Sequence, residues 1–168
     1  MNTRTLVLSL AALAASACAQ SGIAVGDLHN GNQDPKQVKF TWKADAHSPE
    51  RGSIWGDMPD DKHYAGRYYQ VMADVPEQVY SSAWGGAEPY WPDWPVTSPA
   101  AADKANWNTF AATYTGLAIA TLTAASGGPV IRCRFNVNSP TAGLVRGGSG
   151  ECKLSDGTTI QNVVLGAD

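Results

Sequence analysis

The sequence predicts an all-β protein, an antiparallel meander that curls into a small barrel or sandwich. Residues 131–137 alternate apolar and polar side chains with the period of two that marks a half-buried strand. Between residues 113 and 165, runs rich in Thr and apolar residues are separated by turns rich in Gly, Ser and Asp. Strands joined by such short turns pair antiparallel, so we expect neighbours in sequence to be neighbours in the sheet.

The N-terminal residues 1–19 predict a signal peptide for export. Arg4 supplies a positive charge, and the apolar stretch from Leu6 to Ala15 is too short to span a bilayer. Two cleavage sites are open. Cleavage before Gln20 would release a soluble periplasmic or secreted protein. Cleavage before Cys18, within a segment that resembles a lipobox, would leave a lipidated cysteine at the mature N-terminus. Both place the protein on the periplasmic side of the cell envelope, with the outer membrane as the expected site of an anchor.

Residues 20–36 are rich in Gly, Asn and Asp and predict a flexible tether. A single β domain is then expected over residues 37–168. Its first strand should run from Gln37 to Lys43, because apolar residues at 38, 40 and 42 alternate there with polar ones.

The segment 52–64 repeats the residue pattern of the segment 148–160, with Gly, Ser and Asp at equivalent positions. Each segment predicts two strands joined by a tight turn, and a three-residue turn in the first places Tyr64 opposite Gly56. Duplication inside one β domain and chance are both open as explanations.

Residues 88–95, with Trp84 and Trp107 nearby, form an aromatic segment that is interrupted by three prolines, which exclude regular structure. Two interpretations stay open: an exposed platform for sugar rings or a protein partner, and a loop that packs its rings over the open end of the sheet. The ligand-binding candidates in this segment are Trp84, Tyr90, Trp91, Asp93 and Trp94. A short helix is expected to follow, from Asp103 to Phe110.

Cys133 and Cys152, the two cysteines outside the signal, are expected to form a disulfide in an oxidising compartment. Antiparallel pairing of the two strands that hold them places Cys133 opposite Cys152 and Phe135 opposite Gly150. A three-residue turn over residues 155–157 then places Ile160 opposite Cys152.

The last predicted strand breaks this alternation. Val163 and Leu165 do not share the parity of Ile160, which predicts a strand that is buried on both faces.

Composition and motifs predict no catalysis, no metal, no cofactor and no nucleic acid partner. The net charge is −3 and the chain has no basic run. Asp57, Asp60, Asp61 and His63 match neither a calcium loop nor a zinc signature. Ser149 lacks the second glycine of a nucleophile elbow, so we expect no catalytic residue there.

The C-terminal pattern resembles one in small, uncharacterised envelope lipoproteins of Gram-negative bacteria. The residues that carry the resemblance are Ile131-Arg132-Cys133-Arg134-Phe135, Gly143-Leu144-Val145, Gly147-Gly148-Ser149-Gly150-Glu151-Cys152 and the Asp156-Gly157 turn. The resemblance implies an envelope lipoprotein and no known chemistry.

The expected function is therefore a non-enzymatic envelope lipoprotein with a structural or binding role. Its expected partners are the membrane, through Cys18, and an envelope glycan or protein. The alternatives are a periplasmic inhibitor or carbohydrate-binding module that uses the aromatic segment and, as a second alternative, a hydrolase.

Overall fold

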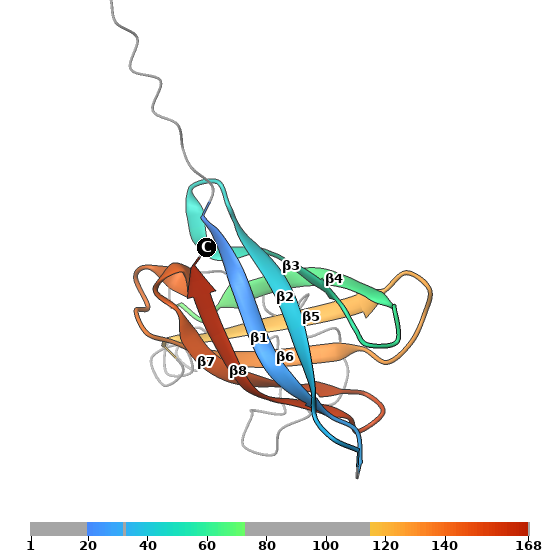
Figure 1. The fold of residues 1–168 in the computed structure, drawn as a ribbon. Coiled ribbons are helices and arrows are strands. Elements are labelled where there is room, and N and C mark those ends of the chain that lie inside the picture. The colour runs from blue at the N-terminus through green and yellow to red at the C-terminus, as the bar shows by residue number, and fades with distance from the viewer. Residues whose placement is uncertain (1–19, 32, 73–114, 168) are drawn as a thin grey trace, which may run out of the picture.

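The computed structural model describes residues 20–31, 33–72 and 115–167. These residues form eight antiparallel strands that follow one another in chain order and close into a barrel, as Figure 1 shows from blue β1 to red β8. The prediction of an all-β meander is confirmed, and the architecture is the barrel. The elements are β1 (Ser21–His29), β2 (Lys36–Asp45), β3 (Ser48–Asp57), β4 (His63–Gln70), β5 (Leu117–Ala124), β6 (Ile131–Val137), the 3-10 turn η2 (Gly143–Arg146), β7 (Gly148–Leu154) and β8 (Thr159–Ala167). The helix predicted from Asp103 to Phe110 lies outside the described residues.

β1 corrects the prediction of a flexible tether over residues 20–36. The strand pairs with β2 on one side and with β8 on the other, so it closes the barrel. Its buried positions are the small residues Gly22, Ala24 and Gly26, so no large apolar side chains mark its inward face. The β domain therefore begins at Ser21, and the strand predicted from residue 37 is the second of the barrel.

The barrel interior is packed by aromatic side chains that lie against glycines on the neighbouring strand. The cross-strand pairs are Gly22 with Trp42, Phe40 with Gly56, Gly52 with Tyr68, and Phe135 with Gly150. A Cβ atom added at Gly22 would lie 2.6 Å from Cζ2 of Trp42, so even alanine would not fit there. Pairing a large residue with a small one lets a closed barrel fill its interior without a void.

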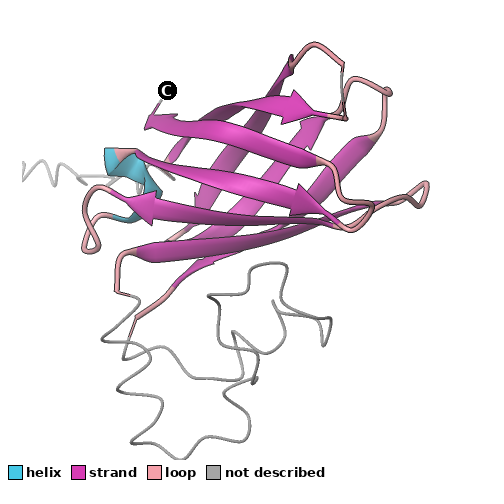
Figure 2. Cartoon of the chain, turned by 90° about the horizontal axis from the view of Figure 1, so that it is seen from below, coloured by secondary structure: helices cyan, strands magenta, loops and turns pink. Residues whose placement is uncertain are grey.

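One end of the barrel is covered by η2 and the loop that precedes it. Leu144 of η2 is buried in the core, and the Gln70 side-chain amide donates a hydrogen bond to the Pro140 carbonyl oxygen at 2.5 Å. Figure 2 shows this cyan turn next to the C-terminal end of β8. Because β1 begins and β8 ends here, we call this the terminal end of the barrel.

The two turns predicted to be equivalent are closed by the same hydrogen bonds. In the first, the Met58 N–H donates to the Lys62 carbonyl at 3.0 Å and the Asp61 N–H to the Met58 carbonyl at 2.9 Å. The corresponding bonds within residues 154–158 are 2.9 and 3.0 Å long. Asp61 and Gly157 occupy the left-handed position of their turns, with φ of 60° and 91°. The three-residue turn is confirmed in both copies.

Tyr64 is paired with Gly56, as predicted. The ring nearest to Gly56 is nevertheless that of Phe40 on β2, whose Cδ1 would lie 2.8 Å from an added Cβ.

Cys133 on β6 and Cys152 on β7 form the predicted disulfide. Their Cα atoms are 4.0 Å apart, and both residues are buried. The predicted register is confirmed on both sides of the bridge, because Phe135 is paired with Gly150 and Ile160 with Cys152.

A β-bulge in β8 corrects the prediction that this strand is buried on both faces. Gln161 and Asn162 together stand opposite the single residue Glu151 of β7. The extra residue shifts the alternation by one, which returns Val163 and Leu165 to the buried interior. The parity break in the sequence therefore marks a bulge in a strand with one solvent face.

Candidate functional site

The end of the barrel opposite η2 holds a cavity of about 220 Å³ between the turns. Met58, Tyr64 and Leu154 form part of its apolar wall, and Asp60 and Lys62 lie at its rim. These two charges form an ion pair at 2.6 Å. The cavity is smaller than the roughly 300–1,000 Å³ of most ligand sites, so it is a weak candidate for a ligand of ordinary size.

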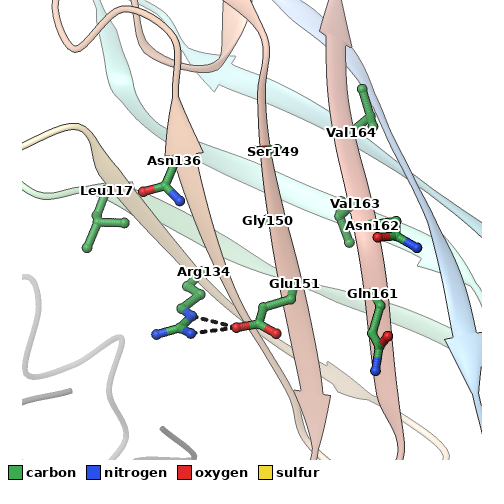
Figure 3. Close-up of a pocket in the computed structure, with 10 residues that line it drawn as sticks. All are labelled: Leu117, Arg134, Asn136, Ser149, Gly150, Glu151, Gln161, Asn162, Val163 and Val164. Carbon is green, nitrogen blue, oxygen red and sulfur yellow. Dashed lines mark hydrogen bonds and ion pairs between the residues drawn. The ribbon is translucent and has the colours of Figure 1, made fainter. Parts of the chain in front are cut away.

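A larger hollow of about 830 Å³ lies on the outer face of the barrel, over β6, β7 and β8. We call it the outer groove. Figure 3 shows the side chains that surround it, with Arg134 and Asn136 coming from β6, Glu151 from β7, and Gln161 and Asn162 from β8. Its volume lies within the range of ligand sites, and its lining mixes amides, charges and apolar groups.

The groove is crossed by an ion pair between neighbouring strands. Arg134 donates from Nε and from one terminal nitrogen to the same oxygen of Glu151, at 2.8 and 2.6 Å. The two side chains are 27% and 36% exposed, so both contribute to the wall of the groove and remain in contact with solvent. The pair brings one positive and one negative charge to the site, and these compensate each other.

The bulge in β8 builds the other wall. Asn162 has a φ of 53°, in the left-handed region, and its Nδ2 donates to Asp27 on β1 at 3.3 Å. Asparagine tolerates this conformation better than most residues. Gly26 makes room behind the bulge, because a Cβ there would lie 2.8 Å from methyl groups of both Ile160 and Val163.

Several groups outside the groove have shifted pKa values with structural causes. The hydrogen bond between Lys62 and Asp60 lowers the pKa of the carboxyl group and raises that of the amine. Hydrogen bonds from Arg67 to the Asp45 carboxylate raise the pKa of the guanidinium group. Burial raises the pKa of Tyr68. Each of these shifts belongs to a turn, a surface ion pair or the core.

The candidate residues selected from the sequence lie partly outside the described residues and partly at separate places on the barrel. Cys18 and the aromatic candidates Trp84, Tyr90, Trp91, Asp93 and Trp94 lie outside the described residues. His63 Nδ1 lies 2.7 Å from an oxygen of Asp57. No group of three or more His, Cys, Asp and Glu side chains in the described part of the chain is arranged to hold a metal ion. Ser149 lies exposed at the start of β7, where it lines the outer groove.

Sequence reasoning missed Asn162 and Gln161. The sequence signal for them is the break in alternation between Ile160 and Val163, which are three positions apart. Taken alone, this break predicts burial on both faces. An extra residue in the strand explains the same break and turns two consecutive amide side chains toward solvent.

The fold defines a class, an eight-stranded up-and-down antiparallel β-barrel with a filled interior and an internal disulfide. Comparison of the chain with protein-family models, curated proteins and solved structures finds no match. Among the described residues, no helix has the length and apolar character needed to cross a membrane.

Proposed function

We propose that this protein is a non-enzymatic binding protein of the bacterial cell envelope, exported by its N-terminal signal and anchored by a lipid on Cys18. The observation that carries the proposal is the disulfide between Cys133 and Cys152. Disulfides form and persist in oxidising compartments. This bridge joins two buried residues at the centre of a strand pair, which supports folding of the barrel outside the cytoplasm.

The position of β1 gives the anchor a structural consequence. Ser21 is three positions after Cys18, so a lipid on Cys18 would be separated from the barrel by a link of roughly 10 Å at most. The terminal end of the barrel would then face the bilayer. The opposite end, with its smaller cavity, would point away from the membrane.

A binding role is supported by the outer groove and by the placement of the ionisable groups. The groove offers amide groups and an ion pair, which donate and accept hydrogen bonds. The shifted pKa values named above belong to structural contacts, whereas catalytic sites use such shifts to prepare an acid or a base.

Metabolic labelling with radioactive palmitate tests the anchor. We expect label on the wild-type protein and on a Gln20→Ala control, and loss of label in Cys18→Ala. Absence of label on the wild-type protein, or label that persists in Cys18→Ala, would contradict the proposal.

A further inference from the structure

We propose that the outer groove binds a neutral, polyhydroxylated ligand, a glycan chain of the cell envelope. This glycan site rests on the proposed function, because the barrel meets envelope glycans only if the protein is exported. The juxtaposition that defines the site is a set of amides on β6 and β8 around the ion pair that joins β6 to β7.

The bulge supplies the first argument. An unbroken strand turns only alternate side chains to one face, whereas β8 presents the two consecutive amides Gln161 and Asn162 beside Glu151. Asn162 is held in a left-handed conformation to do this, and Gly26 clears the space behind it. Bulges are frequent beside functional sites, where they redirect side chains.

The hydrogen-bonding capacity of these side chains supplies the second argument. Asn136 and Ser149 make no side-chain hydrogen bond within the described part of the chain, and both are exposed in the groove. The amide group of Gln161 donates weakly to Thr159 at 3.3 Å, which leaves its carbonyl oxygen to accept. Amide and hydroxyl groups that both donate and accept suit the hydroxyl groups of sugars.

Charge decides the class of glycan. Among the described residues of the lining, the charged side chains are Arg134 and Glu151, and these two form an ion pair. Because each of these two charges is paired with the other, the described lining offers no unpaired cation to a phosphate or sulfate group, which disfavours phosphate-rich or sulfated chains. A neutral glycan brings no unpaired charge into the groove, so its binding carries no cost for removing such a charge from water.

The dimensions and the apolar margins agree with a chain of sugar rings. Asn136 on β6 and Asn162 on β8 flank β7, which places the two strands about 10 Å apart and leaves room for more than one ring. Val164 is 61% exposed at one side of the groove, and Leu117 lies at the other. Such side chains can cover the C–H faces of the rings.

Titration of the ¹⁵N-labelled mature, disulfide-bonded protein tests the site. The side-chain amide signals of Asn136, Gln161 and Asn162 are followed by NMR against a tetramer of N-acetylglucosamine, a tetramer of glucose, and dextran sulfate. We expect saturable shifts of these signals with at least one neutral tetramer. Asn162→Gly, which keeps the left-handed backbone, should weaken binding by about 3- to 10-fold through the lost hydrogen bond.

The matched control is Gln37→Ala, which removes an exposed amide from a separate hollow over β2 and β3, and which should bind as the wild-type protein does. Three outcomes would overturn the proposal: no saturable shift with either neutral tetramer, shifts centred on Trp55 in that separate hollow, or tightest binding of dextran sulfate. None of these changes the palmitate result, so failure of the glycan site and failure of the lipid anchor are distinguishable.

Discussion

Gly52 on β3 lies directly across from Tyr68 on β4, and its missing side chain makes room for the tyrosine ring. A Cβ at residue 52 would lie 2.6 Å from Cε1 of Tyr68 and 2.1 Å from the Lys43 carbonyl oxygen. Trp42 stands in the same relation to Gly22. Glycines at these positions let large rings pack inside the closed barrel.

The substitution Gly52→Ala should therefore lower the free energy of unfolding by about 1–3 kcal/mol, because the added methyl group forces the core apart. Gly166→Ala is the matched control. Apart from the residue itself and its two chain neighbours, no heavy atom lies within 4 Å of a Cβ at that strand position, so its effect should stay within about 0.5 kcal/mol. Urea unfolding of both variants measures the difference, and equal stabilities would contradict the packing account.

Alkaline pH should destabilise the barrel through its buried tyrosines. Burial raises the pKa of Tyr64 and Tyr68 above the ordinary value of 10.0. The contribution of these two tyrosines to the free energy of unfolding is fully present below pH 10 and falls as the pH rises. It falls because the tyrosines ionise at lower pH in the unfolded chain than in the folded one. Each one lowers the free energy of unfolding by about 1.4 kcal/mol per pH unit until its folded form also ionises.

Urea unfolding between pH 8 and about pH 11 checks this dependence. Tyr68→Phe should make the fall shallower, because it removes one of the two buried phenol groups. A wild-type stability that stays constant across this range would disprove the expected burial effect.

The disulfide should contribute substantially to stability. Its cysteines are 19 positions apart, and closing a loop of this size stabilises a protein by about 3 kcal/mol in the chain-entropy estimate. The double variant Cys133→Ala/Cys152→Ala should lose about that much in urea unfolding. Cys18→Ala serves as the control and should unfold as the wild-type barrel does. A loss below about 1 kcal/mol in the double variant would refute the expectation.

The bulge residue separates backbone conformation from side-chain chemistry. Asn162→Gly should keep the stability within about 0.5 kcal/mol, because glycine adopts a φ of 53° without a steric penalty. Asn162→Val should cost about 1–2 kcal/mol, because a β-branched residue is strained there. Thermal unfolding compares the two, and a valine variant as stable as the glycine variant would show that the conformation is not maintained.

The predictable part of the fold is the part where large apolar residues alternate. The strand around Cys133 and Phe135 could be placed and paired correctly, because its inward side chains carry the hydrophobic signal. β1 could not be recognised as a strand, because the residues at its buried positions are small. They are small because large rings lie opposite them. Gly22 and Ala24 sit beside Trp42 and Phe40, and only barrel closure brings these residues together.

The candidate site was less accessible to sequence reasoning than the fold. The outer groove joins Arg134 on β6 to Glu151 on β7 and to the amides of β8, and no local motif encodes that arrangement. The position of Asn162 depends on an extra residue in the ladder, which the sequence registers only as a break in alternation.

The most direct test of the central claim is the intact mass of the mature protein isolated from the envelope. Export with lipid anchoring predicts an N-terminus at Cys18 that carries covalent acyl chains, with two further hydrogens gained only after reduction of the Cys133–Cys152 bridge. An unmodified chain that begins at Gln20 would contradict the anchor, and an uncleaved chain with free thiols would contradict export itself.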